Sequence, residues 1–198
     1  MIAIIKYNAG NVQSVQYALQ RLGEASIVTD DETVIRAADK VIFPGVGHAN
    51  AAMNYLREKS LDKIIVSLTQ PVLGICLGLQ LMCKHSEEGD TNCLGIFDEQ
   101  VKLFSPSKDA AILKVPQIGW NSIYNYQSVL FNGLEDGAFV YTVHSYYAAL
   151  GNETIATTNY VLPYSAALEK GNFYAVQFHP EKSGIIGETI LKNFIAIK

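Results

Sequence analysis

The stretch from 71 to 80, PVLGICLGLQ, constrains the fold more than any other part of the chain. Apolar residues typical of a buried strand lead into Cys76, and helix-forming residues resume directly after it. Gly74 and Gly78 flank the cysteine at the positions where a tight strand-to-helix turn leaves no room for side chains. The pattern G-x-C-x-G therefore predicts a nucleophile elbow with sulfur in place of a hydroxyl.

The predicted elbow has electrical consequences for Cys76. A helix that begins just after the cysteine directs its N–H groups and the positive end of its dipole at the sulfur, which favours a thiolate. The N–H of Leu77 would point to the place where a carbonyl oxygen becomes an oxyanion. A cysteine at a glycine-rich turn is also commonly a small buried hydrophobic residue, so both interpretations stay open at this point.

Strand and helix patterns alternate through the first half of the chain. We expect strands at 2–5, 25–28, 40–43 and 72–76, and helices at 12–22, 33–38, 49–59, 61–68 and after the elbow. Repeated strand–helix units predict a parallel sheet with helices on both faces. From 101 to 146, shorter apolar stretches broken by Pro106 and Pro116 predict mixed or antiparallel β structure, and the last helix is expected at 189–197. The expected fold class is α/β, an open and mostly parallel sheet with a smaller antiparallel β region.

Composition narrows the class of protein. A length of 198 residues with 49% hydrophobic residues and no linker-like segment predicts one domain over 1–198. A net charge of −4 does not suit a nucleic-acid-binding surface. Apolar runs too short to span a bilayer, and an N-terminus unlike a signal peptide, lead us to expect a cytoplasmic protein without a membrane partner. Three cysteines without CxxC spacing argue against a disulfide framework and a zinc site, and we expect no metal or cofactor.

Two further segments follow predicted strands at the same sheet edge as the elbow. The segment 44–47, PGVG, would supply a second oxyanion donor from the N–H of Val46 or Gly47 if it lies beside Cys76, and it can equally be an ordinary turn. The turn at 7–11 follows the first strand. At its end, Asn11 is expected to cap the next helix.

A histidine and a carboxylate leave the strand predicted at 174–178. His179 and Glu181 are two residues apart, so in an extended segment both side chains point the same way. Together with a cysteine elbow, they match a general base and the group that orients it. A lone histidine is commonly structural, and Glu181 could instead pair with Lys182 on the surface.

Six motifs together resemble those of the class-I glutamine amidotransferases over nearly the whole chain. They are PGVG at 44–47, GICLGLQ at 74–80, SEEG at 86–89, VPQIGWN at 115–121, VHSYY at 143–147 and QFHPEKSG at 177–184. Four of them are most similar to the glutaminase subunits of imidazole glycerol phosphate synthases. The resemblance implies a flavodoxin-like class-I (type-1) glutamine amidotransferase domain that hydrolyses glutamine to glutamate and ammonia.

The resemblance also implies roles for single residues. Cys76 would attack the carboxamide of glutamine, His179 would carry the proton to ammonia, and Glu181 would orient the imidazole. The oxyanion hole would be formed by Val46, Gly47 and Leu77. Glutamine would be bound by Gly47, Gln80, Glu88, Ser145 and Tyr146. Glu88 lies at the far end of the elbow helix, where a carboxylate opposes the dipole, and a role opposite an ammonium group would account for it.

A partner is implied as well, a (β/α)8-barrel cyclase subunit in a heterodimer. It would use the ammonia to make imidazole glycerol phosphate and the aminoimidazole carboxamide ribonucleotide. The positions similar to those that face the partner are Asn11, Trp120, Tyr141 and Lys182. Two departures from the family pattern, Lys6-Tyr7-Asn8 in place of Asp-Tyr-Gly and Gln117 in place of a histidine, are expected to affect this interface.

Two alternative functions remain. The first is the glutaminase subunit of an anthranilate or aminodeoxychorismate synthase, which would share the hydrolysis chemistry. For that group we would expect GHQ after the elbow, whereas this chain has GLQ. The second is a non-catalytic flavodoxin-like module whose thiol senses oxidants, against which the HPE motif argues.

Overall fold

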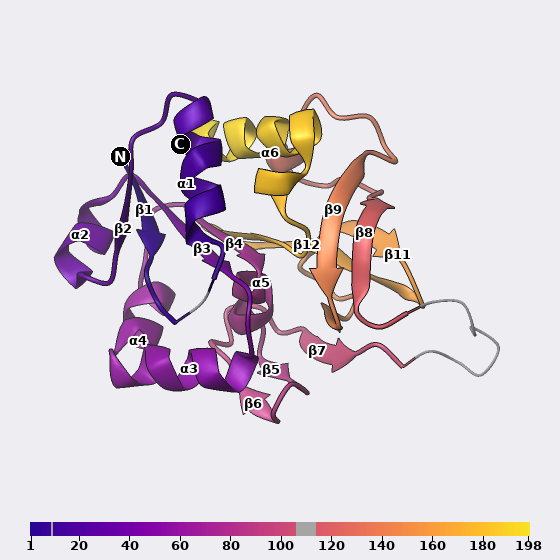
Figure 1. Ribbon diagram of the computed structural model, residues 1–198, viewed down its shortest axis with the longest axis horizontal. Coiled ribbons are helices and arrows are strands. Elements are labelled where there is room, and N and C mark those ends of the chain that lie inside the picture. The colour runs from indigo at the N-terminus through magenta and orange to yellow at the C-terminus, as the bar shows by residue number, and fades with distance from the viewer. Residues whose placement is uncertain (9, 106–113) are drawn as a thin grey trace.

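The computed structural model describes residues 1–8, 10–105 and 114–198, so that Ala9 and Pro106 lie outside it (Figure 1). Its main element is a seven-stranded sheet of order β11-β12-β13-β4-β3-β1-β2. The five strands from β13 to β2 are parallel, while β12 and β11 add antiparallel pairs at one edge. The strand bounds are β1 Ile2–Ile5, β2 Ser26–Thr29, β3 Lys40–Gly45, β4 Val72–Cys76, β11 Thr154–Asn159, β12 Pro163–Lys170 and β13 Phe173–Val176.

Helices cover both faces of this sheet (Figure 1). One face carries α1 (Val12–Arg21) and α6 (Gly184–Ala196). The opposite face carries α2 (Glu32–Ala37), α3 (Ala49–Glu58), α4 (Leu61–Val66) and α5 (Leu77–Met82). Because strand side chains alternate between faces, Ile2 and Ile4 enter one hydrophobic core, and Ala3 and Ile5 enter the other. None of the described helices is long and apolar enough to cross a membrane.

Two smaller sheets complete the fold. The first has the order β10-β7-β5-β6, and the second is the antiparallel pair β8-β9, which stands beside α6 in Figure 1. Their bounds are β5 His85–Ser86, β6 Thr91–Asn92, β7 Gln100–Leu103, β8 Gln117–Ser122, β9 Phe139–His144 and β10 Tyr146–Ala148, with 3-10 helices η1 Val129–Phe131 and η2 Pro180–Lys182. The expected α/β class, with its smaller antiparallel region, is confirmed.

The segment around Trp120 is strand β8, whose residues pair one for one with β9, in agreement with the antiparallel β structure expected over 101–146. One local expectation was wrong. The last helix begins at Gly184, five residues before the expected start. The first turn of this helix could not be recognised from the apolar spacing, because Ile185 is apolar but 80% exposed.

Candidate active site

Cys76 lies in a strained turn between a strand and a helix. It is the last residue of β4, and α5 begins at the next residue. Its φ of +53° is rare for a residue with a side chain. A Cβ on Gly78 would lie 1.9 Å from the carbonyl oxygen of Phe43, so only glycine fits there. The local geometry is that of the nucleophile elbow predicted from the glycine spacing.

Cys76 opens into a cavity of about 280 Å³. The neighbouring strand β3 brings PGVG beside it, because Gly45 pairs with Cys76. Every residue predicted for the oxyanion and substrate positions lines this cavity: Val46, Gly47, Leu77, Gln80, Glu88, Ser145 and Tyr146. The sequence interpretation assigned no role to three other lining residues, Pro116, Val143 and His144, which lie within the VPQIGWN and VHSYY motifs.

Glu88 contributes a carboxylate to the cavity wall. Its Oε2 atom accepts a hydrogen bond of 2.6 Å from the backbone N–H of Ala49, the first residue of α3. The expectation that Glu88 lies at the end of the elbow helix was wrong, because α5 ends at Met82 and β5 follows before Glu88. Its carboxylate instead lies at the N-terminus of α3, where a negative charge is favoured. The cavity therefore carries a fixed carboxylate that could meet an ammonium group.

His179 and Glu181 form a buried pair. Nδ1 of His179 lies 2.7 Å from Oε1 of Glu181, and both side chains are fully buried. The segment is not extended as expected, because Pro180 begins a 3-10 turn that folds Glu181 back onto the imidazole. Burial alone would lower the pKa of His179, but interactions with Cys76 and Glu181 raise it to about 10. In the described part of the chain Nε2 has no hydrogen-bond partner.

Asn11 contacts this pair instead of capping a helix. It occupies the N-cap position of α1 at a φ of +75°, but its side chain makes no capping hydrogen bond. Its Nδ2 donates to Oε1 of Glu181 and lies 3.4 Å from Nδ1 of His179. The capping interpretation was therefore wrong. The sequence did not indicate that the turn after β1 places the amide of Asn11 beside the His–Glu pair.

Of the remaining residues implied to face a partner, two lie on the β8-β9 pair and Lys182 lies beside it on η2. Trp120 is 58% exposed, and its ring lies 6.0 Å from that of Tyr141. The ammonium group of Lys182 lies 5.9 Å from the centre of the Tyr141 ring. Among the described residues no ion pair joins Lys182 to Glu181, so the surface-pair alternative for Glu181 was wrong.

Gln117 lies behind the cavity and not on the surface. It is 3% exposed, and its amide lies 2.9 Å from the hydroxyl of Tyr164, which in turn lies 3.2 Å from Nε2 of His144. Nδ1 of His144 donates to the carbonyl of Tyr146 on the cavity wall. Burial lowers the pKa of His144 to about 4. Gln117 is thus buried, while Lys6 and Asn8 are exposed, and the expected effect of these residues on the interface stays a prediction.

Comparison with known proteins decides the family. The family model for class-I glutamine amidotransferases matches residues 3–197. The chain belongs to the class-I glutamine amidotransferases. Among relatives of this amidotransferase, imidazole glycerol phosphate synthase subunit HisH of Bacteroides fragilis (strain YCH46) is 57% identical over 99% of both chains. The HisH subunit of Escherichia coli K12 is 46% identical over 98% of both chains.

Solved structures agree on the fold of this amidotransferase. A structure described as a glutamine amidotransferase superposes with a TM-score of 0.74 at 16% identity, covering 98% of this chain and 97% of its own. The glutaminase domain of Trypanosoma brucei CTPS gives a TM-score of 0.64 at 16% identity, covering 100% of this chain and 94% of its own. At these identities the likeness concerns the fold alone.

Proposed function

We propose that this chain is the glutaminase subunit of an imidazole glycerol phosphate synthase, formed by one domain over 1–198. It hydrolyses glutamine to glutamate and ammonia and passes the ammonia to a cyclase subunit. The observation that carries the proposal is the single cavity shared by Cys76, Gln80, Glu88 and the backbone of Gly47. The two HisH relatives, similar over nearly their full length, support the choice of this synthase among those that use glutamine.

The proposed reaction starts at Cys76. Its sulfur attacks the carboxamide carbon of glutamine, and the oxyanion that forms is held by the N–H groups of Leu77 and of the Val46–Gly47 segment. The C–N bond then breaks, ammonia leaves with a proton from His179, and a thioester remains. Water attacks the thioester with His179 as the base, which releases glutamate and restores the thiol. Atoms balance as glutamine plus water giving glutamate plus ammonia.

Two groups prepare His179 for this proton transfer. Glu181 accepts from Nδ1, so the second nitrogen, Nε2, is left for the reaction. Asn11 donates to the same carboxylate and fixes its position. The raised pKa of His179, about 10, means that the imidazolium is favoured at neutral pH. The proton needed by the leaving ammonia is then already in place.

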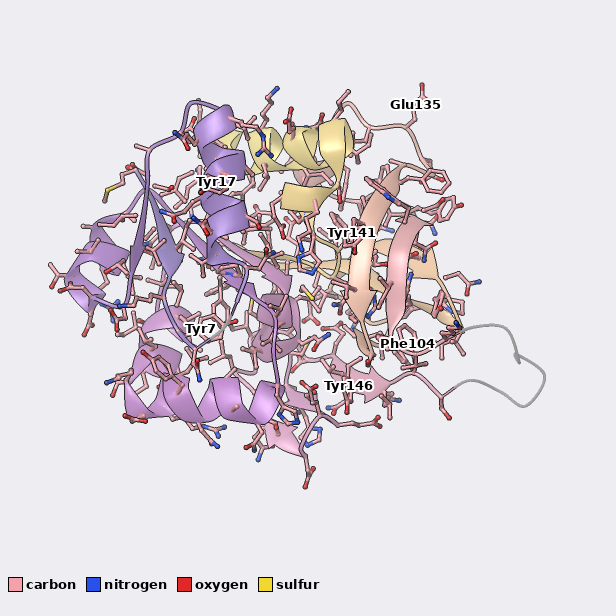
Figure 2. The ribbon with its side chains drawn as sticks, in the orientation of Figure 1. Tyr7, Tyr17, Phe104, Glu135, Tyr141 and Tyr146 are labelled. Carbon is pink, nitrogen blue, oxygen red and sulfur yellow. The ribbon has the colours of Figure 1, made fainter. Side chains whose placement is uncertain are left out.

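The exposed face of β8-β9 is the proposed docking surface for the cyclase subunit, which would be a (β/α)8 barrel in a heterodimer. The register places Ile118 and Trp120 opposite Val143 and Tyr141 on one face of the pair (Figure 2 labels Tyr141 on β9). Large apolar side chains are unusually exposed there and at the start of α6: Ile118 64%, Trp120 58%, Phe139 59% and Ile185 80%. Several exposed large apolar side chains on one face are typical of a protein interface.

Glutamine turnover by the purified chain tests the proposal, measured alone and then with the candidate cyclase and its ribonucleotide ligand. We expect strong stimulation by the partner. Trp120→Glu should weaken that stimulation, whereas Val66→Glu, which changes an exposed apolar residue on α4, should retain it. High turnover without stimulation would leave the cysteine chemistry and remove the assigned partner. Absence of turnover under both conditions would favour a non-catalytic thiol module.

A further inference from the structure

A buried amide lies against the sulfur of Cys76. Gln177 is 1% exposed, and its Nε2 atom lies 3.8 Å from Sγ of Cys76, within hydrogen-bond range for sulfur. We propose that Gln177 is a further catalytic residue, a hydrogen-bond donor that stabilises the thiolate form of Cys76. The inference rests on the proposed function, because it takes Cys76 as the nucleophile. Gln177 stands two residues before His179, so the period-two spacing of the strand end could have indicated it.

The orientation of the Gln177 amide follows from its neighbour. Nε2 of Gln80 donates to the carbonyl of Tyr146 at 2.9 Å, and a carbonyl can only accept, so the NH2 group of Gln80 is fixed there. The same Nε2 lies 3.3 Å from the side-chain oxygen of Gln177. Reversing the Gln177 amide would set two NH2 groups against each other. The oxygen of Gln177 therefore faces Gln80, and its NH2 group must face the sulfur.

The donor has a specific electrostatic task. The thiol of Cys76 can donate to the carbonyl of Val143, 3.8 Å from Sγ, which favours the neutral form. An N–H directed at the sulfur favours the anion instead, because hydrogen bonds to charged groups are stronger than those between neutral groups. The effect of Gln177 on the ionisation of Cys76 is thus opposite to that of Val143, and Gln177 does not itself titrate. In the described ranges of the chain, Cys76 influences the pKa values of three titratable groups, His179, Tyr7 and Tyr164.

Alkylation of the full chain by iodoacetamide tests this role without glutamine or a partner. The extent of reaction at Cys76 is read by peptide mass spectrometry, since only the thiolate reacts. Gln177→Met keeps the length of the side chain and removes the donor. We expect alkylation of Cys76 at pH 7 to slow by about tenfold.

The matched control is Gln70→Met. Gln70 donates its amide to the carbonyl of Ile35, away from the sulfur, so its loss should leave the alkylation rate unchanged. A wild-type rate at pH 7 in Gln177→Met would overturn the proposal. Failure of the chain to turn over glutamine would leave this readout intact, so the two proposals fail separately.

A second measurement, which keeps Gln177 in place, tests the proposal if Gln177→Met does not fold. The side-chain amide protons of Gln177 are followed by NMR from pH 6 to pH 10 in the wild type and in Cys76→Ala. If Gln177 donates to the thiolate, the resonance of its amide proton should move downfield as the sulfur ionises. This change should be absent in Cys76→Ala. Equal behaviour in the two chains would contradict the contact on which the proposal depends.

Discussion

At the scale of single residues, Cys76 combines near-complete burial with a backbone conformation that costs energy. It is 5% exposed and has a φ of +53°. Strain of this kind is on the order of 1–3 kcal/mol and persists only where the surroundings enforce it. Here the turn is enforced by Gly78, packed against the backbone of Phe43. The sulfur is consequently held at one point of the cavity wall.

Replacing each cysteine in turn distinguishes the nucleophile from the structural thiols. Cys76→Ala should lower glutamine hydrolysis by at least about 10⁴-fold while the circular dichroism spectrum stays native. Cys83→Ala and Cys93→Ala should retain hydrolysis, because burial raises the pKa of Cys83 well above its usual value and that of Cys93 to about 12. Substantial turnover by Cys76→Ala would remove the nucleophile assignment.

At the scale of elements, the elbow depends on close approach between α5 and strand β3. In Gly78→Ala the new Cβ would meet the backbone oxygen of Phe43 at 1.9 Å, and backbone atoms of a central strand cannot move aside cheaply. We expect a loss of about 3 kcal/mol or more in the free energy of unfolding. Urea denaturation measures it.

Gly23→Ala provides the comparison for Gly78→Ala. Gly23 follows α1, two residues after Arg21, at a φ of +79° and with open space around its Cβ position. Its replacement should cost only the conformational strain, about 1–2 kcal/mol. Equal losses in the two variants would mean that the contact with Phe43 relaxes and does not constrain the turn.

The sequence predicted the elements whose patterns are local. β1 was predicted with its observed bounds, and the elbow followed from the spacing of its glycines. Antiparallel β structure was predicted over 101–146, but the bounds of β8 were not, because its pairing with β9 involves residues about twenty positions away and leaves Ile118 and Trp120 exposed. The 3-10 turn at 180–182 was also missed, since Pro180 is compatible with both an extended segment and a first helical turn.

The contacts of side chains were less accessible to sequence reasoning than the elements. Cys76 and His179 could be selected because their motifs are specific. The residues that position them could not be selected, because they are distant in the sequence. Asn11 and Glu181 are 170 positions apart, and Gln80 and Gln177 are 97 positions apart. No periodicity along the chain encodes contacts at such separations; they follow from the strand order that places β1, β3, β4 and β13 in one sheet.

At the scale of the whole molecule, His144 couples folding to pH. Its pKa is lowered by burial to about 4, below the value of about 6.5 in an unfolded chain. The unfolded state therefore binds the proton more readily, so this contribution to stability is present above pH 6.5 and is lost as the pH falls toward 4. The full effect is on the order of 3 kcal/mol.

His144→Asn isolates that effect from the titration of the carboxylates. An asparagine amide can still donate to the carbonyl of Tyr146, which His144 contacts at 2.8 Å, but it does not titrate. Urea denaturation at pH 7.5, 5.5 and 4.5 should show wild type losing stability relative to the variant only below about pH 6.5. Parallel curves for the two chains would show that His144 is not the group responsible.

Both ends of the chain lie at the edge of the sheet opposite the cavity. The amino group of Met1 pairs with Asp39, and the carbonyl of Ile197 accepts from Lys40, where β3 begins, whereas Cys76 lies where β4 ends (Figure 1). A surface, bead or fluorescent label attached through either end would thus sit behind the edge of the sheet that carries the cavity. An immobilised chain would still present Cys76 and the β8-β9 face to the solution, which suits it to capture and single-molecule formats.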